Sequence, residues 1–139
     1  IETMEKNLEQ YPTIQVTLDV HRDALGDQSV RYKPVVEVDG QKAAQIMIIS
    51  GCDDDGAMGF PDWEYNFRFA LRLQDKNTEL YGDIMRPLLF GAYKYNEHMT
   101  RGSLLVEFGT EVNSIDEVCY SGELFGKALV EVLESLMDE

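Results

Sequence analysis

Positive charge is scarce in this chain of 139 residues. Lys and Arg together number 12 against 26 Asp and Glu, which gives a net charge of −14 at neutral pH. Nucleic acid is therefore excluded as an expected partner, because binding to phosphates needs clustered Lys and Arg. An anionic membrane surface is an equally poor partner. The simplest interpretation of the acidity is solubility.

Cysteine and long apolar runs are also scarce. Only Cys52 and Cys119 are present, which excludes a cysteine-based zinc finger and a small disulfide scaffold and leaves open whether the two thiols bond. No apolar run approaches the roughly 18–20 residues that cross a bilayer. Hydrophobic residues make up 44% of the chain, which is typical of a globular protein. The chain is long enough to bury one hydrophobic core. We expect a single domain.

Hydrophobic periodicity divides the chain into alternating strands and helices. Helices are expected over residues 2–10, from 60 to about 76, and from 115 toward the C-terminus. Strands are expected over residues 14–20, 34–38, 43–49, 86–90 and 103–108. This order predicts an α/β fold: a three-layer sandwich with a central, mostly parallel mixed sheet, one β-hairpin and flanking helices.

Three local signals sharpen this prediction. Asp39-Gly40 is typical of a tight hairpin turn, because both central positions need a positive φ. Ser114 and Glu117 have the spacing of a capping box at the start of the last helix. The apolar residues of the middle helix predict the stripe that it buries, which is Trp63, Phe67, Ala70 and Leu71.

Two ionisable side chains stand near the ends of apolar strands far apart in the sequence. Glu107 follows Leu104-Leu105-Val106, where desolvation favours the protonated form and suits the carboxyl group to moving a proton. His21 ends an alternating strand, where a ring can reach a ligand crevice and bind a metal ion. Asp19 or Asp23 can hold its second nitrogen. Together they favour metal-assisted hydrolysis, against a plainer interpretation as ordinary polar residues.

Other motifs suggest chemistry that the sequence does not complete. His21-Arg22-Asp23 is reminiscent of a kinase catalytic loop, but Gln28 replaces the Asn that such a loop needs. Asp53-Asp54-Asp55-Gly56 suggests a calcium loop, yet Ala57 stands at a ligand position, so a solvated acidic loop is the better interpretation. We expect His98, the other histidine, at the surface rather than in contact with substrate.

A set of short motifs extends along nearly the whole chain. They are Asp19-Val20-His21-Arg22-Asp23-Ala24, Val36-Glu37-Val38-Asp39-Gly40, Trp63-Glu64-Tyr65-Asn66, Ala70-Leu71-Arg72-Leu73, Met85-Arg86-Pro87, Tyr95-Asn96-Glu97-His98, and Leu105-Val106-Glu107-Phe108-Gly109 with Asn113 and Glu117. In this order they resemble the stage II sporulation protein P family, relatives of the zinc-dependent N-acetylmuramoyl-L-alanine amidases.

The resemblance implies that His21 is a zinc ligand and Glu107 the catalytic carboxylate of a peptidoglycan hydrolase. The bond cut is then the amide between the lactyl group of N-acetylmuramic acid and L-alanine, with peptide cross-links as a further target. It also implies action outside the cytoplasm, on septal wall during engulfment in sporulation, by a parent protein anchored in the membrane through a segment outside this chain. The implied partners are peptidoglycan and a transglycosylase, stage II sporulation protein D.

In the family, a further His and Glu ligand lie upstream of the first helix, and residues 1–10 contain no such His. We therefore expect an amidase-like domain over residues 1–139, truncated at its N-terminus, with zinc weak or absent and no activity alone. The alternatives are a catalytically silent module that binds peptidoglycan or a septal protein, and a plain structural domain. We also expect an exposed sheet edge able to pair with another chain.

Overall fold

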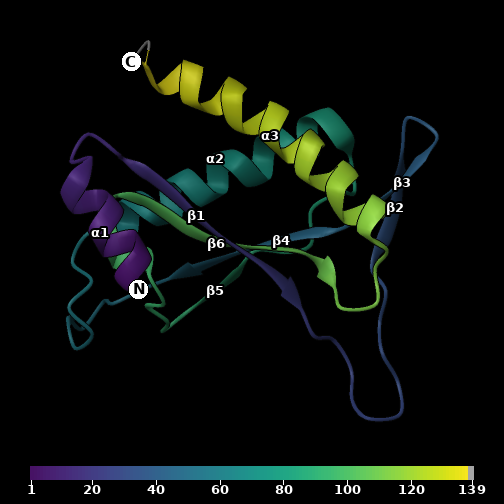
Figure 1. Cartoon of the computed structure of the whole chain (residues 1–139), viewed down its shortest axis with the longest axis horizontal. Helices are drawn as coiled ribbons and strands as arrows, with labels where there is room; N and C mark the ends of the chain where they lie inside the picture. The colour runs from purple at the N-terminus through teal and green to yellow at the C-terminus, as the bar shows by residue number, and fades with distance from the viewer. Residues whose placement is uncertain (138–139) are drawn as a thin grey trace.

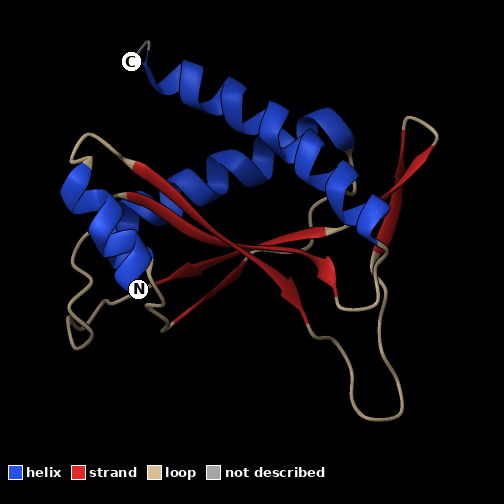
Figure 2. Cartoon of the chain, viewed as in Figure 1, coloured by secondary structure: helices blue, strands red, loops and turns tan. Residues whose placement is uncertain are grey.

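The computed structural model describes residues 1–137, which form a mixed sheet, a separate hairpin and flanking helices (Figure 1, Figure 2). The helices are α1 (Glu2–Gln10), α2 (Trp63–Tyr81) and α3 (Ile115–Met137), with a 3-10 turn η1 (Glu97–Met99). The strands are β1 (Val16–Asp23), β2 (Val35–Val38), β3 (Gln41–Ala44), β4 (Ile46–Gly51), β5 (Leu89–Gly91) and β6 (Gly102–Thr110). The predicted α/β fold with a mixed, mostly parallel sheet and one hairpin is confirmed.

The sheet places β6 at its centre and β1 at its edge. Its strand order is β1-β6-β4-β5, with β1 parallel to β6, β4 parallel to β5, and β4 antiparallel to β6. Every residue of β6 is buried, as its apolar run predicts. Within residues 1–137, β1 pairs with β6 alone, so the expected exposed edge is present. Pairing of that edge with another chain stays a prediction.

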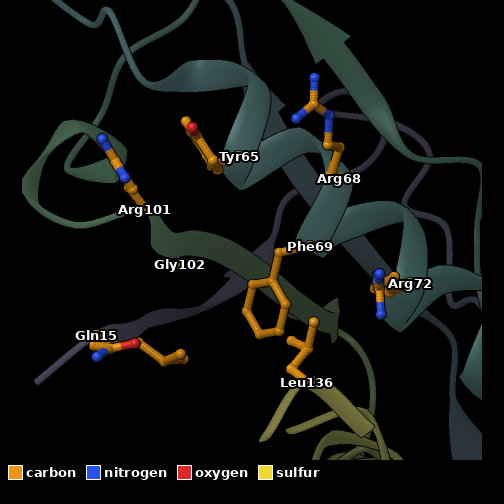
Figure 3. Close-up of a pocket in the computed structure, with 9 residues that line it drawn as sticks. Gln15, Tyr65, Arg68, Phe69, Arg72, Arg101, Gly102 and Leu136 are labelled. Atoms are coloured by element: carbon orange, nitrogen blue, oxygen red, sulfur yellow. The ribbon is translucent and has the colours of Figure 1, made fainter. Parts of the chain in front are cut away.

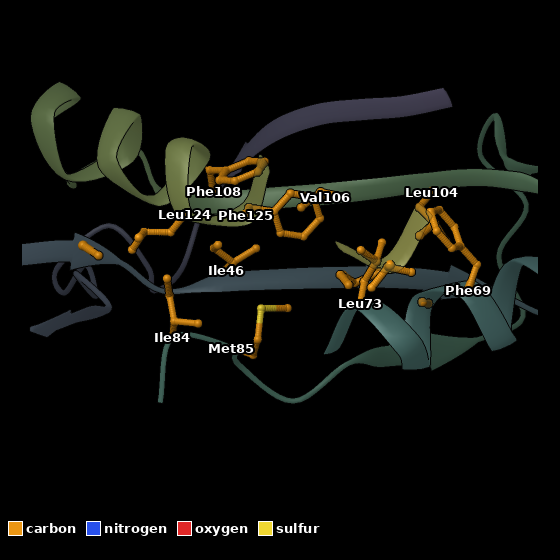
Figure 4. Close-up of a cluster of buried hydrophobic side chains, with 14 of the residues drawn as sticks. Ile46, Phe69, Leu73, Ile84, Met85, Leu104, Val106, Phe108, Leu124 and Phe125 are labelled. Atoms are coloured by element: carbon orange, nitrogen blue, oxygen red, sulfur yellow. The ribbon is translucent and has the colours of Figure 1, made fainter. Parts of the chain in front are cut away.

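The main core fills the space between the sheet and the helices α2 and α3 (Figure 4). The sheet contributes Ile46, Ile48, Leu104, Val106 and Phe108, and the helices contribute Phe69, Ala70, Leu73, Leu124, Phe125 and Val132. Phe108 and Phe125 meet edge to face with their ring centroids 5.4 Å apart. A smaller apolar cluster of Met47, Ile49 and Leu105 comes from the alternate positions of β4 and β6, and therefore lies on the opposite face.

The hairpin turn is as predicted, but the second arm is shorter than predicted. Asp39 and Gly40 both have positive φ angles, of 51° and 78°. The predicted arm over residues 43–49 is wrong, because β3 ends at Ala44 and β4 joins the other sheet. Gln45 separates them: its backbone N–H donates to the Pro34 carbonyl at 3.1 Å, and its side chain donates to the Asp83 carbonyl at 2.7 Å.

Helix α2 buries a different face from the one predicted. Its buried residues are Asn66, Phe69, Ala70, Leu73 and Asn77. The predicted stripe is therefore wrong except for Ala70. Of the others, Leu71 is 40% exposed, and Trp63 and Phe67 pack beside the ring of Phe90. The buried face is partly polar, because Asn66 donates to the carbonyls of Glu97, Thr100 and Ser103 at 2.7–2.9 Å.

The capping box at the start of α3 is confirmed. The Ser114 backbone N–H donates to Glu117 Oε2 at 3.0 Å, and the Glu117 N–H donates to Ser114 Oγ at 3.2 Å. Cys52 and Cys119 are both free thiols. No helix within residues 1–137 combines the length and apolar character needed to span a membrane.

Candidate functional site

His21 and Glu107 are direct neighbours across the parallel pair of β1 and β6. They are Cα partners in the register, one step beyond Val20 and Val106. Adjacent strands lie about 4.8 Å apart, and partners at the same level of the pleat project from the same face of a sheet. The structure therefore brings together the two residues that the sequence singled out. Their shared face also carries the small cluster of Met47, Ile49 and Leu105.

Glu107 is a buried carboxyl group, and one of its two oxygens lacks a hydrogen-bond partner among the described residues. It is 8% exposed, and the oxygen without such a partner is Oε2. Burial raises the pKa of Glu107, and the nearby Asp23 carboxylate raises it further, whereas His21 and Arg86 oppose the rise. A carboxyl group with a raised pKa holds a proton more readily than a solvated one, which suits it to returning a proton during a reaction.

The imidazole of His21 is held by a carboxylate. Its Nε2 lies 2.9 Å from Asp19 Oδ1, and Asp19 Oδ2 accepts a hydrogen bond from Asn96 Nδ2 at 3.0 Å. Since an ionised Asp only accepts, the proton of a neutral ring is assigned to Nε2, which leaves the Nδ1 lone pair for a ligand or a proton. The His21 side chain is 48% exposed and so faces solvent. Of the two expected carboxylate partners, Asp19 is the one that binds it.

Asp23 instead forms an ion pair with Arg86. Arg86 Nη1 lies 2.8 Å from Asp23 Oδ2, and both side chains are mostly buried. The guanidinium group of the neighbouring Arg22 donates hydrogen bonds to the carbonyls of Thr110 and Asn113. These bonds connect the end of β1 to the turn after β6. These contacts fix the carboxyl ends of both strands and thereby the relative position of His21 and Glu107.

A β-bulge follows Glu107. The register shifts between His21 and Asp23, where β6 carries one extra residue, and Gly109 there has a φ of 64°. A Cβ at Gly109 would lie 2.6 Å from Asn113 Oδ1, so the position needs glycine. Asn113 Oδ1 accepts from the Thr110 N–H at 2.8 Å, which makes Asn113 a support of the strand end rather than part of the site.

Glu117 is likewise structural. Its carboxylate caps α3 and lies 2.8 Å from Lys33 Nζ. Burial alone would raise the pKa of Glu117, but hydrogen bonds from Lys33, Ser114 and Asn113 outweigh it and lower the pKa to about 2. Glu117 therefore stays ionised and is unsuited to proton transfer.

The acidic loop shows no metal-binding arrangement. The buried Asp53 carboxylate accepts the backbone N–H groups of Met58 and Phe60 at 3.0 and 2.7 Å and so organises the loop, while Asp54 and Asp55 are exposed. His98 is exposed, as expected.

The described residues do not complete a zinc site. Within residues 1–137 there is no group of three His, Cys, Asp or Glu side chains placed to hold a metal ion. Around His21, Asp19 is engaged with the imidazole and Asn96, and Asp23 is engaged with Arg86. What this arrangement can do by its own residues is hold an exposed imidazole beside a buried carboxyl group whose pKa is raised.

Sequence reasoning gave no role to Arg86 or Asn96. Both reach the site from segments distant in the chain, and a hydrophobic pattern contains no information on such pairings. Their only sequence signal is membership of the motifs Met85-Arg86-Pro87 and Tyr95-Asn96-Glu97-His98. In the structure, Tyr95 adds a second signal, since it has a φ of 41°, which is uncommon for a residue other than glycine.

The comparisons with known proteins point to one family. The family model described as stage II sporulation protein P matches residues 1–130. No curated protein and no solved structure matched the chain.

Proposed function

Because this chain belongs to the stage II sporulation protein P family, we propose that it is part of a peptidoglycan hydrolase that cuts the amide between the lactyl group of N-acetylmuramic acid and L-alanine. Membership of the family gives the chain a sporulation-related role associated with peptidoglycan. The observation that supports the specific reaction is the register pair of a half-exposed His21 and a buried Glu107.

In the proposed reaction, Glu107 moves the proton. Its carboxylate takes a proton from the attacking water as the new C–O bond forms, and its carboxyl group returns that proton to the alanine nitrogen as the C–N bond breaks. The products are the free lactyl carboxylic acid and the free amine. The orphan Oε2 supports this role, because an unpaired buried oxygen is free to bind a water molecule. The raised pKa of Glu107 is in keeping with both halves of the cycle.

We also propose His21 as one ligand of a zinc ion. Asp19 at Nε2 is the kind of carboxylate partner that orients a metal-binding imidazole, and it leaves Nδ1 for the ion. Since residues 1–137 contain no group of three ligands, the other ligands have to come from outside them. No step of the proton transfer above is routed through the metal.

The lack of a complete ligand group within residues 1–137 also favours a second candidate function. This is an amidase-like module that binds peptidoglycan or a septal protein without cutting it. The two candidates differ in whether the intact protein releases muropeptides. The transglycosylase partner, a protein like stage II sporulation protein D, stays a prediction.

The test is a pair of variants in the intact protein. In Glu107→Gln, the amide cannot carry the proton, so we expect release of new alanine amino termini from purified peptidoglycan to fall by at least about a hundredfold. The control Glu111→Gln removes a partly exposed carboxylate four residues away, which lies 3.7 Å from Arg31 Nε, and we expect wild-type hydrolysis. Near-normal cleavage by Glu107→Gln would refute the role of Glu107, and an intact wild type that binds wall without cutting it supports the silent module.

A further inference from the structure

A pocket of about 290 Å³ lies at the amino-terminal ends of β1 and β6 (Figure 3). His21 and Glu107 lie further along these strands, toward their carboxyl ends. The pocket wall from α2 carries Tyr65, Arg68, Phe69 and Arg72, which share one face of the helix by their spacing. The starts of the two strands and the end of α3 complete it with Gln15, Val16, Arg101, Gly102 and Leu136. The pocket therefore draws residues from four elements.

Positive charge gathers at this pocket in a chain that has little of it. Three of the 12 basic residues line it: Arg68, Arg72 and Arg101. The guanidinium carbons of Arg68 and Arg101 lie 5.8 and 4.4 Å from the centroid of the Tyr65 ring, so both groups lie against this one aromatic side chain. In a protein of net charge −14, this is a local concentration of basic side chains.

Two of these arginines already pair with carboxylates of the protein, and these ion pairs are weak enough for an incoming anion to replace them. Arg68 pairs with Glu64 at 2.7 Å and Arg101 with Asp62 at 3.3 Å. All four side chains are between 47% and 64% exposed, so water screens both ion pairs and they contribute little. A ligand that offers a carboxylate in bidentate geometry can replace them, because the guanidinium fork matches a planar carboxylate.

The floor of the pocket is apolar. Phe69 is 6% exposed, and Val16 and Leu136 add aliphatic surface. An apolar floor beneath a basic rim suits a ligand with both a small apolar group and an anionic group. The volume is of the size that holds a few amino-acid residues, which suits a short peptide.

We propose that this pocket binds the carboxylate end of a short peptide. The free carboxyl group pairs with the guanidinium group of Arg68 or of Arg101 at the rim, and an adjacent aliphatic side chain lies against Phe69. The peptide chains of the cell wall are the source of this ligand, a statement that rests on the proposed function. The pocket then grips a peptide carboxylate at the end of the sheet opposite the proposed reaction.

The experiment is calorimetric titration of the intact protein with alanyl-glutamyl-lysine and with its fully amidated counterpart. We expect the acid to bind at least about tenfold more tightly than the amide, because only the acid forms charged bidentate contacts. Replacing Arg68 and Arg101 by Gln, singly and together, weakens acid binding by at least about tenfold in the double variant. The matched control is Arg31→Gln, which removes a 62% exposed arginine elsewhere and leaves binding unchanged.

Several outcomes would overturn this proposal: no binding of the acid, equal binding of acid and amide, or unchanged binding in the double variant and both single variants. Displacement of the peptide by an equal concentration of inorganic phosphate would show a general anion site and overturn it as well. The result is separable from the proposed function, because Glu107→Gln retains peptide binding while hydrolysis is lost. Loss of binding in Glu107→Gln would instead place the peptide at the other end of the sheet.

Discussion

Strands β1 and β6 run side by side in the same direction, yet they meet very different surroundings. Val20 and Val106 are register partners, and Val20 is 63% exposed whereas Val106 is fully buried. One step further, the His21 side chain is 48% exposed and Glu107 is 8% exposed. The difference arises because β1 is the edge strand and β6 is central. A register pair across this boundary joins a solvated group to a desolvated one.

The proposed hydrolysis depends on this boundary. An exposed imidazole is open to an ion or a substrate, whereas burial raises the pKa of the Glu107 carboxyl group, which favours its return of a proton. Were both residues on β6, the imidazole would be shielded. If both were on β1, the carboxylate would be solvated, and burial would no longer raise its pKa. Substitutions that alter one member of the pair, or one strand, at a time test this contrast.

The largest effect is expected from removing the exposed member. His21→Ala in the intact protein lowers zinc content to the background level and lowers peptidoglycan hydrolysis by roughly a hundredfold. Thermal stability changes little, since the ring is half exposed. Elemental analysis gives the zinc content, and His98→Ala, the variant of the other histidine, is the control that keeps both zinc and activity. Unchanged zinc in His21→Ala contradicts its role as a ligand.

The two valines test the contrast in burial without touching the site. Val106→Ala removes two methyl groups from the closed core and is expected to lower the free energy of unfolding by about 2 kcal/mol. Val20→Ala, at the same level of the sheet, is expected to change it by less than about 0.5 kcal/mol. Chemical denaturation measures both. Equal losses in the two variants would show that β1 is covered in solution, as pairing of its edge with another chain would cause.

Glu97 is a second buried carboxyl group, and it has no role in the proposed reaction, so it shows the effect of burial alone. Glu97 is 1% exposed and accepts the Gly51 N–H at 2.8 Å, and burial raises its pKa to about 7. The folded state therefore holds this proton at a pH where the unfolded chain, with a pKa near 4.5, has lost it. Stability falls as pH rises from about 4.5 to 7, and the loss is complete above 7.

Glu97→Gln removes this loss. The variant is expected to melt at least roughly 3 °C above wild type at pH 8, with a smaller difference at pH 5. Scanning calorimetry at the two pH values measures it. This window lies above the range where Glu117 titrates, because protonation of Glu117 costs stability only as pH falls from about 4.5 toward 2. A pH-independent difference between variant and wild type would show that Glu97 is ionised throughout.

Local signals in the sequence predicted local structure well. The turn at Asp39-Gly40 and the capping box of Ser114 and Glu117 depend on the conformation of a few adjacent residues, and both are present. The buried face of α2 was mispredicted in part because its Asn66 is satisfied by the carbonyls of Glu97, Thr100 and Ser103, which lie more than thirty residues away in η1, β6 and the segment between them. A hydrophobicity pattern counts such an Asn as exposed, since the groups that bind it are invisible in the helix itself.

The same distinction applies to the site. His21 and Glu107 were predicted from their positions at strand ends, and the parallel register places them together. Their supporting partners could not be predicted, because the contacts of Arg86 with Asp23 and of Asn96 with Asp19 depend on how distant segments fold over the sheet. The pocket beside Tyr65 lies beyond sequence reasoning for the same reason, as it draws on four separate elements.

The most direct test of the central claim is a double-variant cycle on peptidoglycan hydrolysis by the intact protein. Rates are measured for wild type, His21→Ala, Glu107→Gln and the variant that carries both changes. If the neighbouring side chains act as one hydrolytic unit, the double variant is no slower than the slower single variant. Losses that multiply, or substantial hydrolysis remaining in the double variant, would show that the pair on β1 and β6 is not the reaction site.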